Sequence, residues 1–498
     1  MDAPMSLEDA QKMTERYSNE LIYRRPAIDE RLNYVRGTTG TLKYASEKFG
    51  EYFAKRFSGF SDNWCSPVAQ SGAERMNYTG FRLFGQNTGF DIELARVWEA
   101  NDCEGASSEA FLVFGAASRS FALVSPNDGV TPTITFEHPA QTLVDTDPQT
   151  RQRRAALVVW IDDKFDYATL YTPDWIYKFQ RESGEDRYLN YDRDGRYFDR
   201  AVLGGWTPRL VNGVPAEPER NPLGVVPVVE LRNQTLLDDS PISDIAGVMA
   251  MQDSVNLVWA YLLNALDSAS LPQKVVTGAD VPSIPILDSD GQVVGERPVE
   301  LDKLHGEAIL WLPGGEAKIA EWSVAQLDAF GNVIERCVEH IAAQTRTPPH
   351  YLVAKMVNTA AESLTIAEAG LVSKTRERIR YVNPAIREIN RLVALCQGAD
   401  QKRLTAISSG QALWADVQYR SEAQMADAML KMKQVGFPFE YIAERYGLGP
   451  DEVKRVMAMR QTELAADPLA AAVESMQAAR GGLAAEDQAK ADEMNGLG

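Results

Sequence analysis

One segment restricts the possible folds of this chain more than any other. Residues 243 to about 269 predict a long helix that is apolar on nearly every side and contains no Lys or Arg. Ser243 is a candidate N-cap, and Asp244 stands near the positive end of the helix dipole, where a carboxylate is favourable. A helix that is apolar on all sides must be buried on all sides. In water this means the centre of a large core or a contact between subunits, and the residues alone leave both open.

A membrane does not suit this helix. Its most apolar window, residues 245–266, contains four polar side chains, those of Gln252, Asp253, Asn256 and Asn264. The longest unbroken apolar stretch is far shorter than the roughly 20 residues that span a bilayer. The N-terminal sequence lacks the basic start and apolar run of a signal peptide. We therefore expect no membrane partner.

The composition predicts a globular protein of two or three domains. The chain has 498 residues, of which 45% are hydrophobic and 24% charged. Four cysteines, Cys65, Cys103, Cys337 and Cys396, lie far apart and form no CxxC pair. A disulfide framework or a zinc site is therefore not expected, and a reducing compartment suits the chain better.

The net charge of −19 argues against a conventional DNA-binding domain, because such a domain neutralises phosphates with a basic face. It does not argue against a conduit. A channel through which DNA slides works better when its wall repels phosphates than when it holds them.

The first half of the chain predicts helices followed by strands. Helices are expected at 8–22 and 28–34, interrupted at Arg25-Pro26, and at 46–56. From about 80 to 233 the apolar period changes to two, which indicates strands. The expected strands are 111–114 paired with 121–124, then 133–136, 155–161, 168–171, 175–179 and 225–231. Residues 181–200 alternate charges of both signs and predict an exposed hairpin or loop.

The second half predicts a helical rod with a small cap. An insertion at 271–314, rich in Pro, Gly and β-branched residues, separates the apolar helix from a second one at 323–345. The second helix has one apolar stripe, formed by Leu327, Phe330, Ile334, Val338 and Ile341. Pro348 and Pro349 then break the helix.

After a polar stretch at 353–359, a helix is expected from about 360 to 396, kinked at Pro384. A helical hairpin follows at 421–435 and 439–459, with its break at Gly436-Phe-Pro. The last residues, 464–498, are rich in Ala, Glu, Asp and Gln, and predict a disordered tail.

No catalytic signature is present. The sequence lacks GxxxxGK[ST], GxSxG and HExxH, and it has four histidines, His138, His305, His340 and His350. We expect no catalytic residues, no metal site and no cofactor.

Several blocks, in a consistent order, resemble the portal proteins of long-tailed bacteriophages, the type often called SPP1-type. The resemblance extends from Arg25 to about Met459, and its strongest block is the string HIAAQTRTPPHYL at 340–352. The other blocks are Asn63-Trp-Cys, Ala73-Glu-Arg, Phe136-Glu-His-Pro, residues 145–157, residues 221–229, Gln252-Asp253, Pro272-Gln, Ala361-Glu-Ser-Leu and Ala367-Glu-Ala-Gly-Leu. One departure is Ala360-Ala-Glu-Ser-Leu, where relatives often have Ser-Gly/Ala-Glu-Ala-Leu.

The resemblance implies an α+β portal fold with an α/β wing, a two-helix stem, a small β-containing clip, a kinked tunnel helix and a helical crown. The implied regions are the wing at 1–238, stem helices at 239–270 and 321–345, the clip at 271–320, the tunnel loop at 346–359, the kinked helix at 360–397, the crown at 398–463 and the tail at 464–498.

It also implies a ring, usually of about twelve subunits, at one capsid vertex of the virion, assembled in the host cytoplasm. Double-stranded DNA would enter and leave through this ring. The implied partners are the terminase large subunit, the head–tail adaptor, and the major capsid and scaffolding proteins. ATP hydrolysis would belong to the terminase, so the chain itself is not expected to be an enzyme.

The resemblance gives candidate site residues. For contact with DNA these are Lys355 and Asn358, together with His350, because one lysine per subunit becomes a ring of positive charge; a solvated loop lysine is the alternative. Lys374, Arg376, Arg378 and Arg380 are interpreted as intersubunit or solvated charges rather than a phosphate track. Arg346 either contacts a carboxylate or caps the preceding helix. The stem residues expected at the subunit interface are Val248, Gln252, Val255, Trp259, Leu262, Phe330, Ile334 and Val338.

Two other classes of protein remain as alternatives. A soluble acidic hydrolase that uses carboxylates would need a pocket with convergent polar groups in the β-rich half. Another phage structural protein, such as an adaptor or a capsid-maturation protein, fits less well, because adaptors are generally much shorter. The size of the particle in solution distinguishes a portal ring from a hydrolase and from another structural protein.

Overall fold

The computed structural model describes residues 3–39, 42–56, 59–86, 90–127, 131–162, 164–182, 205–270, 274–277, 283–287, 292–298, 309–312, 318–321, 327–352, 361–418, 422–446, 448 and 450–466. The chain divides into two compact units. Unit 1 comprises Met1–Arg36, Cys65–Gly247 and Thr345–Gly498, and unit 2 comprises Gly37–Trp64 and Val248–Gln344.

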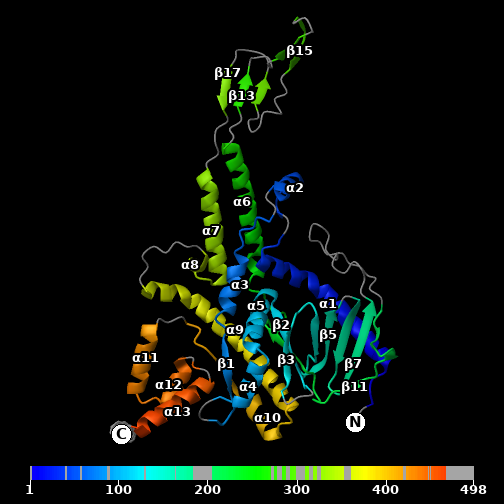
Figure 1. Cartoon of the computed structure of the whole chain (residues 1–498), viewed down its shortest axis with the longest axis vertical. Helices are drawn as coiled ribbons and strands as arrows, with labels where there is room; N and C mark the ends of the chain where they lie inside the picture. The colour runs from blue at the N-terminus through cyan, green and yellow to red at the C-terminus, as the bar shows by residue number, and fades with distance from the viewer. Residues whose placement is uncertain are drawn as a thin grey trace. The chain divides into compact units, whose positions relative to one another are not determined.

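Unit 1 contains an antiparallel sheet of six strands covered by a long helix (Figure 1). The strands are β4 (Thr142–Thr146), β5 (Arg153–Ile161), β6 (Phe165–Tyr171), β7 (Trp175–Glu182), β8 (Thr207–Pro208) and β11 (Glu219–Arg220). The helix α1 (Leu7–Arg36) packs Ala10, Tyr17 and Leu21 into one core with Leu157 and Phe179 of the sheet. The Tyr17 hydroxyl also donates to Asp145 Oδ2 at 2.7 Å, which ties the helix to β4.

A second core in unit 1 surrounds the long helix α9 (Ala361–Cys396). It includes Phe81, Phe114, Ile386 and Ile407, all at most 1% exposed. The surrounding elements are α3 (Cys65–Ala73), β1 (Tyr78–Arg82), α4 (Ile92–Ala100), α5 (Cys103–Ala117), β2 (Arg119–Ser125), β3 (Thr133–Glu137), β12 (Val228–Arg232), α10 (Gln401–Ser408) and β18 (Gln411–Trp414). Strand β18 pairs with β1, so residues that follow α9 close a sheet with the N-terminal region.

The remaining helices of unit 1 are short or C-terminal. They are α8 (Pro349–Leu352), α11 (Glu422–Gln434), α12 (Phe439–Tyr446) and α13 (Pro450–Ala466), and a small hairpin of β9 (Leu210–Val211) with β10 (Val214–Pro215) completes the unit.

In unit 2, two long helices are joined through strands. The helices are α6 (Met249–Ser270) and α7 (Leu327–Thr345), and the strands between them are β13 (Lys274–Thr277), β14 (Ser283–Leu287), β15 (Val293–Pro298), β16 (Ile309–Leu312) and β17 (Lys318–Glu321). Strand β13 follows α6, β17 precedes α7, and the two strands pair antiparallel. The α2 helix (Glu47–Arg56) belongs to the same unit.

Several predicted elements are confirmed. The strands at 121–124, 133–136, 155–161, 168–171 and 175–179 are present as β2, β3, β5, β6 and β7. The long helices α6, α7 and α9 end within one residue of the predicted positions, and Pro384 lies inside α9. Their starts differ more, since α6 begins at Met249 rather than at residue 243 and α7 begins at Leu327 rather than at residue 323. A 3-10 turn, η2 (Ala246–Val248), precedes α6, and the Ser243 hydroxyl accepts from the N–H of Ala246 at 3.3 Å.

Other predictions were wrong. Residues 111–114 are part of α5, because a short apolar run does not distinguish a strand from a buried helix. Pro26 lies inside the continuous α1, since one proline removes a single helical hydrogen bond and both flanks of the helix are packed. Leu21 before it lies in the sheet core, and Arg31 after it donates to the backbone oxygen of Ala117 in α5. The predicted helix 439–459 is two helices, with Pro450 as the first residue of the second.

Arg181 was expected in an exposed hairpin or loop, but it lies in β7 opposite Asp166 and pairs with that carboxylate at 3.1 Å. Both side chains are buried. Residues 183–200 and the predicted tail beyond residue 466 lie outside the described residues.

Two glycines provide a matched test of the second core. A Cβ at Gly410 would lie 2.5 Å from Phe81 Cε1 and 2.7 Å from the backbone oxygen of Arg82, whereas a Cβ at Gly105 in α5 meets nothing within 4 Å. Gly410→Ala should lower the free energy of unfolding by about 1–3 kcal/mol through overpacking. Gly105→Ala should raise it by about 0.5–1 kcal/mol. Urea unfolding of both variants checks this, and an unchanged Gly410→Ala protein would contradict it.

Candidate functional site

A buried ion cluster lies where the chain passes from β12 toward η2. Asp244 and Arg378, each with a side chain 4% exposed, form an ion pair. The Lys374 ammonium lies 4.0 Å from Asp244 Oδ1 and donates to the backbone oxygen of Thr345 at 2.8 Å. Asn233 donates to Asp244 Oδ1 at 3.2 Å. The cluster therefore joins the segment before η2, the last residue of α7 and one face of α9.

Two glycines leave room for this cluster. A Cβ at Gly72 in α3 would lie 1.8 Å from Arg378 Nη1, and a Cβ at Gly115 in α5 would lie 2.7 Å from Asp244 Oδ2. The Gly115 carbonyl also accepts from the N–H of Asp244 at 2.9 Å. Both helices therefore approach the pair more closely than any larger residue would allow.

Burial changes the acid–base chemistry of Lys374. Loss of hydration, with a smaller contribution from Arg378 and Arg346, lowers its pKa to about 8 against the opposing effect of Asp244. A neutral lysine is thus accessible to this site at mildly alkaline pH.

A second polar cluster holds α8 against α9 and the turn that follows α3. Arg75 donates to the Tyr351 hydroxyl at 2.6 Å and lies 3.3 Å from Glu368 Oε2. His350 Nε2 lies 3.8 Å from Glu368 Oε1. Arg75 also donates to the backbone oxygen of Val417 at 3.0 Å. We call Arg75, His350, Tyr351 and Glu368 the clasp; it joins residues on both sides of the segment 353–360.

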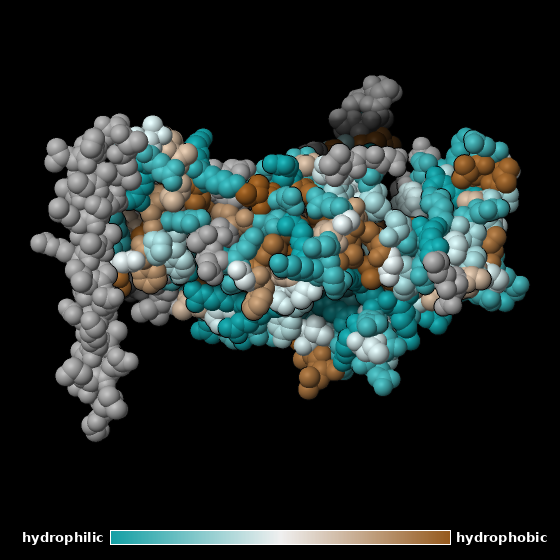
Figure 2. All heavy atoms as spheres, turned by 90° about the horizontal axis from the view of Figure 1, so that it is seen from below, coloured by the Kyte–Doolittle hydropathy of each residue, from teal (hydrophilic) through white to brown (hydrophobic). Residues whose placement is uncertain are grey.

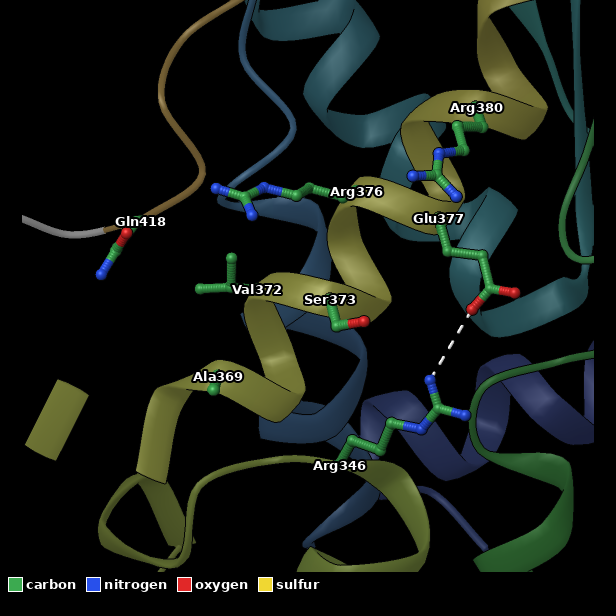
Figure 3. A pocket seen from close by; sticks show the side chains of 8 residues that line it. All are labelled: Arg346, Ala369, Val372, Ser373, Arg376, Glu377, Arg380 and Gln418. Atoms are coloured by element: carbon green, nitrogen blue, oxygen red, sulfur yellow. Dashed lines mark ion pairs between the residues drawn. The ribbon is translucent and has the colours of Figure 1, made fainter. Parts of the chain in front are cut away.

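An open pocket of about 770 Å³ lies on the other face of α9 (Figure 3). Arg346, Arg376 and Arg380 provide cations, Val372 and Ala369 provide apolar surface, and the remaining lining residues are Ser373, Glu377 and Gln418. Glu377 lies 3.7 Å from Arg346. Of the two roles expected for Arg346, the contact with a carboxylate is therefore observed.

The interpretation of the basic residues of α9 was wrong for two of the four. Lys374 and Arg378 are not solvated or free for another subunit, because Asp244 pairs with both inside the chain. Arg376 and Arg380 are exposed and line the pocket. Residues four apart share a helix face, so one pair faces inward and the other outward.

Of the predicted DNA-contacting residues, the structure describes His350 alone. His350 belongs to the clasp, while Lys355 and Asn358 lie outside the described residues, so that assignment stays a prediction.

The stem residues expected at an interface are mostly covered by their own chain. Val248, Gln252, Val255, Leu262, Ile334 and Val338 are buried, and Trp259 and Phe330 are partly exposed. In unit 2, Gln252 Oε1 accepts from the N–H of Trp64 at 2.7 Å, and Trp259 Nε1 donates to Asp62 Oδ2 at 2.7 Å. Exposed apolar side chains of the same helices are Tyr261, Leu266 and Val333.

The sequence-based predictions did not include the contacts of Arg75 in the clasp, the close approach at Gly72 and Gly115, or the burial of Asp244. The available signal was the pair of cations at Lys374 and Arg378, four residues apart on a helix that is otherwise apolar on that face. Their partner is far away in the sequence, and no local pattern identifies it.

The structure gives little support for a metal site, a membrane-spanning helix or a hydrolase site. In the described part of the chain, no group of three metal-ligating side chains occurs, and no helix is long and apolar enough to span a bilayer. On the face drawn in Figure 2, apolar residues form separate small patches between polar ones. The cationic pocket has one carboxylate, Glu377, and lies outside the β-rich half in which a hydrolase site was expected.

Comparison with known proteins gives consistent matches. The sequence model of the family described as "Phage portal protein, SPP1 Gp6-like" matches residues 14–452. The portal proteins of Mycobacterium phages D29 and L5 are each 26% identical over 375 residues, covering 72% of this chain and 70% of theirs. A chain of the structure titled "Neck of native GTA particle computed with C12 symmetry" aligns with 84% of this chain and 99% of its own, at 12% identity and a TM-score of 0.39. A TM-score this low supports no inference about fold or assembly.

The buried lysine predicts a pH-dependent stability. Between pH 8 and 10 the folded state loses the Lys374 proton, while the unfolded state, with the ordinary pKa of 10.5, still binds it. The free energy of unfolding therefore rises with pH in this window. From pH 8 to pH 10, the free energy of unfolding of the unaltered protein should rise by on the order of 2 kcal/mol more than that of Lys374→Met.

Urea unfolding at several pH values measures this difference. Lys402→Met, at an exposed position of α10, is the matched control and should follow the unaltered protein. Parallel stability curves for Lys374→Met and the unaltered protein would show that Lys374 keeps an ordinary pKa.

Proposed function

Because the chain belongs to the SPP1 Gp6-like family of phage portal proteins, we propose that it forms a ring of about twelve subunits at one vertex of the capsid. Double-stranded DNA enters the capsid through this ring during packaging and leaves through it during ejection. The observation that carries the proposal is the family match over residues 14–452. The 26% identity to two mycobacteriophage portal proteins agrees with it.

The proposal assigns roles to the elements. The helices α6 and α7 form the stem, the strands β13–β17 form the clip, α9 is the tunnel helix, and residues beyond 398 form the crown. The paired strands β13 and β17 support this division, since they bring the end of α6 and the start of α7 together. Residues of α10 and β18 share a core with the N-terminal region, and β18 pairs with β1. The packing therefore favours a start of the crown after β18 rather than at residue 398.

The clasp supports a tunnel loop between α8 and α9. Its side chains join Tyr351 and His350, before segment 353–360, to Glu368 after it. A loop with both ends held by a rigid scaffold can present Lys355 and Asn358 to passing DNA. The clip binds the terminase large subunit during packaging and the head–tail adaptor afterwards, and the wing and crown contact the major capsid and scaffolding proteins. Assembly takes place in the host cytoplasm and ends in the virion.

No observation favours a hydrolase. The described pocket is dominated by arginines, and its single carboxylate contacts Arg346. Catalysis by paired carboxylates needs two acids flanking one site.

The first test is the size of the particle. Mass photometry and negative-stain images of the full-length protein should show a ring of about twelve subunits with a central hole. The protein without terminase should show no ATPase activity above background. A stable single subunit, or clear ATP turnover, would contradict the proposed function.

The second test concerns the tunnel loop. Lys355→Gln should leave the ring intact and lower the amount of DNA packaged per capsid, because it removes one positive charge from every subunit at the channel. Lys402→Gln, at an exposed position of α10, is the matched control, and capsids with this variant should package a normal amount of DNA. Equal packaging by both variants would show that Lys355 is a solvated lysine without a role in DNA passage.

A further inference from the structure

A short loop of unit 1 presents two leucines to solvent. Leu236 is 51% exposed, and Leu237, the next residue, is fully exposed. A single exposed leucine is ordinary in a soluble protein. Two adjacent ones at the tip of a loop, followed by Asp238 and Asp239, form a compact group with both apolar and acidic character. We call residues 236–240 the leucine loop.

The leucine loop is held in one conformation. Thr235 and Pro241 form a bridge at its base, and the N–H of Leu236 donates to the oxygen of Ser240 at 3.0 Å. The Ser240 N–H and hydroxyl both donate to Asp238 Oδ1, at 3.0 and 2.5 Å. A loop that is already ordered loses little entropy on binding, which favours a recognition role.

A residue with positive φ is also fixed at the tip of the loop. Asp239 has a φ of +62°, a conformation that few residues other than glycine adopt. Arg151 forms an ion pair with Asp239, and Arg232 lies 3.8 Å from it. These contacts pair Asp239 with cations of its own chain. Among the described residues, Asp238 accepts from Ser240 and forms no ion pair, so its exposed carboxylate beside Leu237 has no cation next to it.

The arginine pocket on α9 has the complementary character. Its surface combines apolar Val372 and Ala369 with the guanidinium groups of Arg376 and Arg380, and Figure 3 shows Arg376 extending toward the Gln418 side. Among the described residues, no carboxylate lies within 4.0 Å of either Arg376 or Arg380. A ligand with one apolar side chain next to one carboxylate matches this pocket. A nucleic-acid phosphate matches less well, because it brings no apolar group to cover Val372 and Ala369.

The geometry points to a contact between copies of this chain, in which the leucine loop of one copy docks into the arginine pocket of the next. Leu237 covers Val372 and Ala369, and the Asp238 carboxylate pairs with Arg376. The two surfaces share no residue, so the contact is heterologous, and repetition of a heterologous contact closes a ring when the rotation permits. This inference rests on the proposed portal ring and names residues that join its subunits.

A charge exchange tests the pairing of Asp238 with Arg376. Asp238→Lys and Arg376→Glu should each raise the protein concentration at which half of the chains are assembled by about ten-fold. The double variant should return it to within about two-fold of the unaltered protein, because the ion pair is restored with reversed sign. Asp238, Arg376 and the control position Lys402 are all exposed, and Lys402→Glu is the matched charge control. Because Asp238 also accepts from Ser240 within the loop, Asp238→Asn, which keeps an acceptor oxygen and removes the charge, should likewise weaken assembly.

Cross-linking tests the contact directly. With Leu237→Cys and Ala369→Cys in one full-length chain, oxidation should give a ladder of covalent multimers, because only a close approach of the two positions permits a disulfide. The pair Leu430→Cys with Ala369→Cys is the control, since Leu430 is similarly exposed on α11. This pair should give no ladder above that of the single variants.

The outcomes separate this inference from the proposed function. A ring that forms normally, without a ladder and without rescue by the charge exchange, would overturn the inference and leave the portal ring in place. Absence of any ring from the unaltered chain would contradict the proposed function itself. An Arg376→Glu protein that assembles normally but binds a short DNA duplex more weakly would identify the pocket as a phosphate site and overturn the inference.

Discussion

The buried pair of Asp244 and Arg378 determines much of unit 1. A carboxylate and a guanidinium that are each 4% exposed are costly to leave unpaired, and removal of one partner of such a pair typically costs 3–5 kcal/mol. The pair fixes α9 against the segment before η2, and the missing Cβ atoms of Gly72 and Gly115 let α3 and α5 approach it. The clasp and the arginine pocket are both built on the stretch of α9 that the pair immobilises. Their geometry therefore depends on an interaction that touches neither.

The helical period explains how α9 serves several purposes at once. Lys374 and Arg378 lie on its inward face, and Arg376 and Arg380 lie on its outward face, where they line the pocket. Six residues before Lys374 on the same helix, Glu368 belongs to the clasp. Polar and charged residues that are close in the sequence of α9 therefore belong to three different sites, the buried ion cluster, the clasp and the arginine pocket. Substitutions two residues apart on this helix should consequently have different effects.

The sequence predicted the elements that local chemistry determines. A strong apolar stripe located α7, the paired prolines Pro348 and Pro349 indicated its end just before them at Thr345, and alternation located β5, β6 and β7. Local patterns could not show that residues 111–114 continue a helix, because a short apolar run suits both structures. They could not show that Lys374 and Arg378 are buried either, since the partner Asp244 is distant in sequence. Gln252 was expected at a subunit interface because of its place on an apolar helix, yet Trp64 and Asp62 satisfy its amide within unit 2.

The burial pattern of α6 differs from that of an ordinary amphipathic helix, and the difference bears on assembly. Gln252, Asp253 and Asn256 are among its most buried residues, held by the segment 37–64 of unit 2 through contacts such as the Asp62 N–H donating to Asn256 at 3.1 Å. Tyr261 and Leu266 are exposed. This helix buries its amide side chains and exposes aromatic and aliphatic ones. Apolar groups on an exposed helix side are typical of a surface that contacts another element. If α6 forms the stem of the proposed ring, this side of the helix, which carries no Lys or Arg, would be covered by a neighbouring copy of the chain.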